Sequence, residues 1–396
     1  MDYTPDGPEI PVPEAACLFD VGSLYHVFEG LTDGRKDRGK RYGLAFVLAI
    51  IVMAKLSGED KPLGIAEWAK GRQRALVKAF GIGRETVPSH NTYRRILRDA
   101  VSVTELESMI YQVLSGRQEQ PDSEIIIAID GKTLRGTLKG PEPVHLLAAY
   151  LPDAGIVLMQ VAVDRKENEI VAAPRLLSCL DLRQAIVIGD AMHTQRSLAV
   201  QIVEAGGDYV SIVKDNQPAL RQDIETLFEP ELCTAGFSAP ATDFQTATTT
   251  NYDHGRYERR TLTTSCLLRD YLDWPYLAQV FQLQRTVTDA KTGEHHQQTV
   301  YGITSLPPHR APPERLLTIV RSYWGIENGL FYRRDATLNE DSTRMTRSSM
   351  ARNMASINNL LIGLLRQAGH RYLPSARRFY SAHFSEAAKL ILRCPS

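Results

Sequence analysis

The stretch Ile125-Ile126-Ile127-Ala128-Ile129-Asp130 is a continuous apolar run that ends on a carboxylate. Because no face of this run is polar, it predicts a β-strand that is buried on both sides. Such a strand carries the negative charge of Asp130 to the edge of a sheet. The run therefore predicts the type of core and also the place where chemistry is to be sought.

A second run of the same kind, Ala185–Asp190 (AIVIGD), also ends on an acid. The segments between and after the two runs alternate between strand and helix patterns, which gives the order βββαβαβ. This order predicts a mixed sheet with crossover helices, in which the first and fourth strands are neighbours. The predicted segments are strands 125–130, 145–151, 156–163, 185–190 and 208–213 and helices 168–180 and 194–205.

Neighbouring parallel strands end at the same edge of a sheet, and ligands of open α/β sheets bind at that edge. We expect Asp130 and Asp190 to meet there, and two adjacent carboxylates repel each other unless a cation neutralises them. Their hard oxygen ligands suit Mg²⁺ or Mn²⁺. The alternative is that each aspartate caps the turn after its strand, and the sequence leaves both interpretations open.

A third acid, Glu327, falls in a helix predicted over 314–334, which begins after Pro312 and Pro313. Its face of the helix is mostly apolar or aromatic, so a carboxylate there needs an ion partner or a metal. The residues that share this face are Val320, Tyr323, Phe331 and Arg334. A salt bridge to Arg321 or Arg334 is the alternative to metal binding. Nearby acids that compete for the role are Asp335, Glu340 and Asp341.

The chain is long enough for several domains, and changes of pattern divide it into four segments. We predict a helical N-terminal domain over 1–122, with the apolar helix 42–56 at its centre. Arg94 and Arg95 follow the N-cap residue Ser89 and fit a DNA-reading helix, with solvated surface arginines as the alternative. The other predicted segments are the first part of the α/β core (123–228), a β-rich insertion (229–298), and the completion of the core with Glu327 and basic C-terminal helices (299–396).

Charge is segregated along the chain although the net charge is zero, with 46 Lys+Arg and 46 Asp+Glu. Residues 342–396 carry nine Lys or Arg and one acid, so their balance is 9 − 1 = +8, whereas residues 1–34 carry acids and no Lys or Arg. This segregation points to an anionic partner at the C-terminal end.

Cysteine usage and hydropathy indicate the compartment. The five cysteines are scattered and their number is odd, which indicates a reducing cytoplasm and no disulfide framework. We expect no signal peptide, and the most apolar segment, 43–54, is too short to span a bilayer.

Short motifs along nearly the whole chain match one known family. They are AIDGK (128–132), RG (135–136), KENEI (166–170), GDAMHTQ (189–195), VKDNQ (213–217), HGRYERR (254–260), WGIEN (324–328), NED (339–341) and NMA (353–355). Through these motifs the chain resembles the DDE transposases of bacterial insertion sequences, in the branch that includes the H-repeat-associated proteins.

The resemblance implies a ribonuclease-H-like core in which Asp130, Asp190 and Glu327 are the catalytic and metal-binding residues. It also implies Mg²⁺, with Mn²⁺ as a substitute, and two-metal attack of water or a 3′-hydroxyl on a DNA phosphodiester. The implied partners are double-stranded DNA, at the terminal inverted repeats and at the target, and a second copy of the chain in a homodimer on DNA. The implied location is the bacterial cytoplasm, at the nucleoid.

Further residues are candidates for DNA contact. Lys132, Lys214 and Gln217 follow strands at the same sheet edge, and His193 follows Asp190. For His193 a hydrogen-bonded structural role is the alternative. The candidates in the insertion and around Glu327 are His254, Arg256, Arg321, Tyr323, Trp324 and Arg334. For these the alternatives are a solvated basic strand edge and ordinary packing or ion pairing along the helix.

The residues around Glu327 depart from the family pattern. The wider superfamily places Tyr, Arg and Lys at offsets that here hold Val320, Tyr323 and Arg334, and this branch usually has histidine at 323 and 331. The three acids are unaffected, so the departures concern the handling of DNA ends. They leave two alternative functions open: a transposase-derived DNA-binding protein that no longer transposes, and a metal-dependent DNA nuclease.

Overall fold

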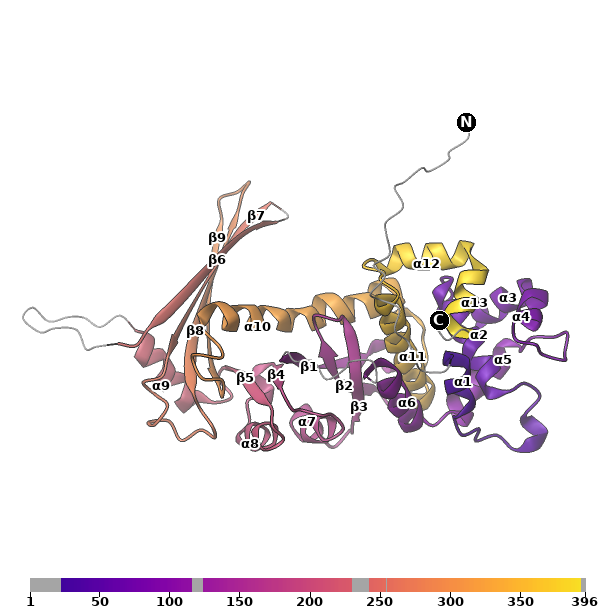
Figure 1. Cartoon of the computed structure of the whole chain (residues 1–396), viewed down its shortest axis with the longest axis horizontal. Helices are drawn as coiled ribbons and strands as arrows, with labels where there is room; N and C mark the ends of the chain where they lie inside the picture. Colours follow the sequence, from indigo (N-terminus) through magenta and orange to yellow (C-terminus); the bar gives the residue numbers. More distant parts are fainter. Residues whose placement is uncertain (1–22, 116–123, 230–241, 254, 393–396) are drawn as a thin grey trace, which may run out of the picture. The chain divides into compact units, whose positions relative to one another are not determined.

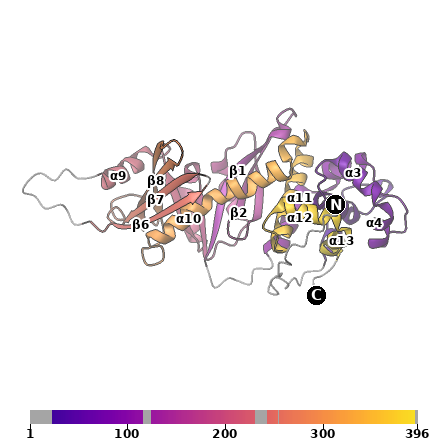
Figure 2. The same cartoon turned by 90° about the horizontal axis from the view of Figure 1, so that it is seen from above.

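The computed structural model describes residues 23–115, 124–229, 242–253 and 255–392. The chain divides into two compact units, which Figures 1 and 2 show in two views. The first unit takes its residues from 1–119, 134–144 and 333–396, and the second from 120–133 and 145–332. The first is built of helices, whereas the second contains the sheet.

The second unit is organised by a mixed sheet with the strand order β3-β2-β1-β4-β5-β9-β8-β7-β6. This finding confirms the predicted mixed α/β architecture. The strands are β1 (Ile125–Leu134), β2 (Val144–Leu151), β3 (Ile156–Val163), β4 (Ala185–Gly189), β5 (Asp208–Val213), β6 (Gln245–Asp253), β7 (Arg256–Ser265), β8 (Gln279–Asp289) and β9 (His295–Thr304). The predicted order βββαβαβ is also confirmed, because helices lie between β3 and β4 and between β4 and β5.

The parallel pairing of β1 with β4 places the two aspartates. The register runs from Ile125 opposite Ala185 to Ile129 opposite Gly189, so the next residue on each strand is an aspartate. The prediction that the first and fourth strands are neighbours is therefore confirmed. The prediction that β1 ends at Asp130 is wrong: β1 is also paired with β2 on its other side and continues to Leu134.

Helices cover the sheet of this unit. In Figure 1, α7 (Glu169–Leu177) and α8 (Arg196–Glu204) lie below β4 and β5, while α10 (Pro313–Gly325) runs above these two strands. α9 (Pro218–Phe228) packs beside β8 and β9. Asn168 caps α7 by accepting from the amide of Val171 at 3.2 Å, whereas the side chain of Thr194 donates to Ile212 O instead of capping α8.

The helix predicted over 314–334 is not one α-helix. Its α-helical part ends at Gly325, and the chain continues as two π-helical segments, η6 (Ile326–Phe331) and η7 (Arg333–Thr337). Hydrogen bonds from residue i to i+5 widen the turns of a π-helix, so side chains after Gly325 no longer follow the 3.6-residue spacing. Short π-helical segments are frequent at functional sites.

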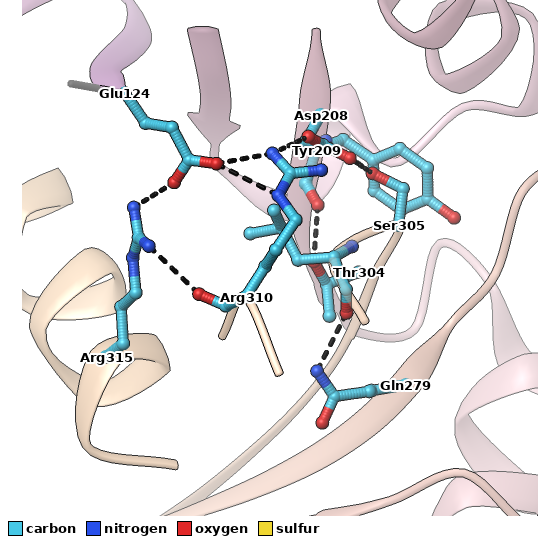
Figure 3. A network of polar contacts seen from close by, with 9 residues as sticks. Glu124, Asp208, Tyr209, Gln279, Thr304, Ser305, Arg310 and Arg315 are labelled. Carbon is cyan, nitrogen blue, oxygen red and sulfur yellow. Dashed lines mark hydrogen bonds and ion pairs between the residues drawn. The ribbon is translucent and has the colours of Figure 1, made fainter. Parts of the chain in front are cut away.

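A polar network fixes the start of α10, as Figure 3 shows. Glu124, just before β1, accepts from Arg310 Nε at 3.0 Å and also pairs with Arg315 in the first turns of α10. Arg310 Nη2 reaches Asp208 of β5 at 2.6 Å. Two carboxylates and two guanidinium groups thus balance each other and join the beginnings of β1, β5 and α10.

The first unit is a helical assembly around α2 (Leu44–Leu56), whose residues are all buried. This confirms the prediction of a central apolar helix. Around it lie α1 (Leu24–Glu29), α3 (Pro62–Gly71), α4 (Gln73–Ala79), α5 (His90–Arg95), η3 (Ile96–Ala100), α6 (Val103–Ser115), α11 (Ser348–Gln367), α12 (Leu373–Ala382) and α13 (Phe384–Leu392). In the parts of the chain that are described, no helix is both long and apolar enough to cross a membrane.

A buried ion network joins the N-terminal and C-terminal helices of this unit. Lys55 Nζ lies 3.0 Å from Asp60 Oδ1, and Arg377 Nη2 lies 2.8 Å from the same oxygen. The side chains of all three residues are at most 9% exposed. Arg377 Nε also donates to Lys55 O at 2.9 Å. Buried charges of this kind are tolerated only when they are paired.

We predict that Asp60→Asn destabilises the first unit by about 3–5 kcal/mol, because it leaves two buried cations without their shared anion. Denaturant unfolding followed by a probe in the helical unit measures the change. The control is Asp37→Asn, whose carboxylate is 98% exposed beside Lys40 and is expected to change stability by less than about 0.5 kcal/mol. Equal effects of the two substitutions would contradict the prediction.

Candidate active site

Two of the three predicted acids directly follow the paired residues of β1 and β4. Asp130 is partly buried, and its Oδ1 accepts from the amide of Gly131 at 2.8 Å. Asp190 begins η5 (Ala191–His193), and its Oδ1 accepts from the amide of Ala191 at 2.6 Å. Lys214, which directly follows β5, places Nζ 3.1 Å from Asp190 Oδ1. Asp190 therefore caps the turn after its strand, as the alternative interpretation predicted, whereas Asp130 lies within β1 and caps no turn.

Glu327 lies in η6 and is exposed. The expectation that its surroundings require an ion partner or a metal is not supported, because the side chain is exposed. An exposed carboxylate needs no ion partner for solvation. It is therefore available to a ligand at the surface.

The pKa of Tyr323 responds to the charges of the acids. Burial raises the pKa of Tyr323 well above its ordinary value, and the charges of Asp130, Asp190, Glu327 and Glu169 raise it further. The charges of all three predicted acids therefore act on one tyrosine of α10. The structure adds a fourth acid, Glu169, for which the sequence predicted no role.

Asp130 has a strongly raised pKa. Burial raises the pKa of Asp130 to about 7, the hydrogen bond from Gly131 opposes the shift, and the charges of Glu169 and Glu327 add to it. The ionised form of a carboxyl group with such a pKa is unfavourable unless a positive charge lies near it. This part of the site is therefore short of positive charge.

Glu169, the first residue of α7, is held by two histidines. His145 Nε2 of β2 lies 2.8 Å from Glu169 Oε1, and His193 Nε2 of η5 lies 3.2 Å from Oε2. Burial opposes ionisation of Glu169, but the hydrogen bonds from both histidines lower its pKa to about 2. Glu169 is therefore a permanent negative charge near Asp130. The only sequence signal for it is its place in the motif KENEI, directly after the helix cap Asn168.

The donor chemistry of this edge fits a divalent cation. Asp130, Asp190 and Glu327 offer the hard carboxylate oxygens that Mg²⁺ and Mn²⁺ prefer, and the raised pKa of Asp130 reflects a charge that a cation would offset. Among the described residues, no three His, Cys, Asp or Glu side chains already stand in a metal-binding arrangement. In this structure Lys214 instead supplies positive charge to Asp190.

The other candidates at the sheet edge fall into two groups. Lys214 is exposed, and Gln217 donates from Nε2 to Thr194 O at 3.0 Å. Lys132 is only 9% exposed and has Nζ 5.6 Å from the centre of the Phe331 ring. His193 is 6% exposed and contacts Glu169, so the structure gives it the environment of the predicted structural alternative.

The candidates on α10 and in the hairpin of β6 and β7 lie near arginine side chains. Trp324 packs under two arginines, with the Cζ atoms of Arg260 and Arg285 at 5.3 and 5.1 Å from its ring centre. Arg321 and Arg256 are exposed. His254, at the turn between β6 and β7, lies outside the described residues.

Arg334 does not lie on a DNA-accessible surface. It is 0% exposed in the first unit, where Nε donates to Glu340 Oε2 at 2.9 Å. The predicted salt bridge alternative between Arg334 and Glu327 is therefore wrong as well, because Arg334 pairs with Glu340 instead. Arg94 and Arg95, also in the first unit, are exposed on α5.

Comparisons with known proteins give one consistent result. The family described as "Transposase DDE domain" matches residues 121–364, and the family "DDE_Tnp_1-associated" matches residues 25–113. The chain is 28% identical over 356 residues to "Putative transposase YncI" of Escherichia coli O157:H7, covering 87% of this chain and 88% of that protein. It is 27% identical over 345 residues to "H repeat-associated putative transposase YhhI" of Escherichia coli K12, covering 85% and 88%. A Xanthobacter autotrophicus protein, "Uncharacterized protein in dhlA 3'region", is 32% identical over 250 residues, covering 62% and 80%.

The raised pKa of Asp130 predicts a pH-dependent stability without divalent ions. A group whose pKa rises from 3.8 to about 7 on folding stabilises the protein fully below about pH 4, and this contribution is lost as the pH rises to about 7. Asn does not titrate, so Asp130→Asn should gain a few degrees of melting temperature relative to the wild type between pH 4.5 and 8. Thermal unfolding in a chelator measures this difference.

The control for this measurement is Asp181→Asn. Interaction with Arg183 lowers the pKa of Asp181 to about 2, so its titration lies below the pH range used. Its melting temperature should keep a constant difference from the wild type. A constant difference for Asp130→Asn as well would contradict the assignment of a raised pKa.

Proposed function

The chain belongs to the DDE transposase family, as its motifs predict, and on this basis we propose that it is an active transposase of an insertion sequence. It cuts DNA at the ends of its element and joins the 3′-hydroxyl ends to target DNA. The observation that carries this proposal is the parallel pairing of β1 with β4, whose last paired residues directly precede Asp130 and Asp190; the charges of these two acids and of Glu327 also act on Tyr323. The strand order β3-β2-β1-β4-β5 supports a ribonuclease-H-like core for the second unit.

We assign the three acids as the residues that would hold Mg²⁺, with Mn²⁺ as a substitute. When bound, divalent ions supply Lewis-acid stabilisation of phosphoryl oxygens and a more acidic nucleophile. The amides of Gly131 and Ala191 orient the first two carboxylates through their hydrogen bonds. Both donors are backbone amides, so these hydrogen bonds do not depend on whether a ligand is bound.

Lys214 and Tyr323 are proposed phosphate contacts. The ammonium of Lys214 is exposed and 3.1 Å from Asp190 Oδ1, so it can turn to a DNA phosphate once Asp190 is otherwise neutralised. The raised pKa of Tyr323 keeps its hydroxyl protonated at neutral pH, and a neutral phenol can donate a hydrogen bond to a phosphate oxygen. Both residues lie beside the acids rather than on a distant surface.

The proposed partner is double-stranded DNA, bound along the exposed basic residues. Arg256 and Arg321 of the second unit and Arg94 and Arg95 of the first are exposed and suit backbone phosphates. A homodimer on DNA is proposed because two element ends have to be paired. The cellular location that follows is the cytoplasm, where the element's DNA lies.

A DNA-binding protein that no longer transposes is the second candidate. The departures at Tyr323 and Phe331 favour this second candidate. Phe331 packs against Lys132, so the aromatic residue at position 331 contacts a basic side chain at the sheet edge. A metal-dependent nuclease without end specificity is the third. These candidates differ from the first in strand joining and in end specificity, respectively.

We predict that Asp130→Asn, Asp190→Asn and Glu327→Gln each lower Mg²⁺-dependent cleavage of element-end DNA by at least about 100-fold, because each removes a charged metal ligand. The measurement is nicking and strand transfer with labelled end DNA. The control is Asp215→Asn, an exposed acid near β5 that pairs with Arg221. Full activity of Asp130→Asn would refute the assignment, and binding without any strand transfer by the wild type would favour the second candidate.

DNA affinity should depend on salt through Arg256. Replacing Arg256 with Gln should weaken DNA binding and reduce the slope of log K against log salt by about 0.9, the value for one phosphate contact. A titration over several salt concentrations measures the slope. The matched control is Arg183→Gln, an exposed arginine just before β4, at the opposite end of that strand from Asp190. Equal slopes for Arg256→Gln and the wild type would exclude this contact.

A further inference from the structure

We propose that Glu169 is a positioning residue that holds the two strand ends that carry Asp130 and Asp190. This inference rests on the proposed function, since it gives those aspartates their task. Glu169 itself is not assigned as a ligand. Its role is exercised through the residues that it contacts.

The carboxylate of Glu169 bridges two elements on either side of α7. One oxygen is 2.8 Å from His145 Nε2 on β2, and the other is 3.2 Å from His193 Nε2 on η5. Because an ionised carboxylate only accepts hydrogen bonds, Nε2 of His145 is the donor. In the neutral ring, Nδ1 of His145 then accepts from the hydroxyl of Thr133 on β1, at 2.8 Å.

Each end of this bridge lies three residues along the chain from one aspartate. Thr133 is three residues after Asp130 on β1, and His193 is three residues after Asp190. The amide of His193 also donates to Asp190 O at 2.9 Å, which closes the turn. The chain of contacts from Thr133 through His145 and Glu169 to His193 therefore ties the end of β1 to the turn after β4.

Glu169 packs closely against Gly131. A Cβ atom placed on Gly131 would overlap the carboxylate of Glu169, so a larger residue there would require the Glu169 side chain to move. The amide of Gly131 is the group that orients Asp130. Glu169 therefore packs directly against the peptide that sets the direction of the Asp130 carboxylate.

The negative charge of Glu169 is unfavourable beside Asp130, and the contacts with the two histidines oppose this effect. Glu169 raises the pKa of Asp130 by repulsion, so an acid at this position opposes ionisation of the proposed ligand. Two histidines nevertheless hold it there. The basis of the proposed positioning role is therefore the pair of contacts that Glu169 makes to two separate elements.

The test compares Glu169→Gln with Glu167→Gln, an acid two residues earlier that pairs with Arg175 at 3.3 Å. We expect Glu169→Gln to bind Mn²⁺ about 10- to 100-fold more weakly in calorimetry, as is usual when a residue that supports metal ligands is lost. In the metal-free protein, amide hydrogen exchange should become faster in peptides that contain residues 130–134 and 190–194. Glu167→Gln should match the wild type in both measurements.

A second pair of variants guards against a folding defect. Gly131→Ala should push Glu169 away and weaken Mn²⁺ binding in the same way, whereas Gly136→Ala is tolerated because its nearest neighbour, Arg344 N, would be 3.5 Å from the new Cβ. If Glu169→Gln and Gly131→Ala keep wild-type Mn²⁺ affinity and exchange, the inference is overturned, even if melting temperatures fall. Failure of the proposed function would look different: Asp130→Asn would then leave Mn²⁺ binding and DNA cleavage unchanged.

Discussion

The parallel pairing of β1 with β4 is the constraint on which the site depends. With Ile129 opposite Gly189, the next residues are Asp130 and Asp190, and no rotation of a side chain can take either acid to another face of the molecule. The apolar strands fix this register because a slip of one residue would turn buried side chains outward. The core thus fixes where both acids lie, and a cationic ligand would offset the burial that raises the pKa of Asp130.

The position of the third acid, Glu327, depends on α10 rather than on the register of the strands. The network of Glu124, Arg310 and Arg315 anchors the start of α10 to β1, and the helix then keeps α-helical spacing up to Gly325. Glu327 follows in the π-helical segment after Gly325 and is exposed. Rigid placement of Tyr323 and exposure of Glu327 are therefore produced by adjacent segments of one continuous helix.

Much of this arrangement could be predicted from the sequence, because the apolar runs before Asp130 and Asp190 are short, unbroken and separated by helix patterns. The π-helical segments could not, since their residues also suit an α-helix and only the hydrogen bonding distinguishes the two. Arg334 was misplaced for that reason, and its pairing with Glu340 depends on tertiary packing. The bridge through Glu169 was missed because His145 and His193 lie on separate elements, 24 residues before and after it in the sequence.

The account rests on one central claim, that Asp130, Asp190 and Glu327 form a single divalent-metal site at this sheet edge. Anomalous X-ray scattering from crystals of the protein with element-end DNA and Mn²⁺ tests it most directly. The account predicts manganese peaks between Asp130 and Asp190 and within reach of Glu327, with Lys214 displaced from Asp190. Ordered manganese elsewhere, with the contact between Lys214 and Asp190 retained, would contradict it.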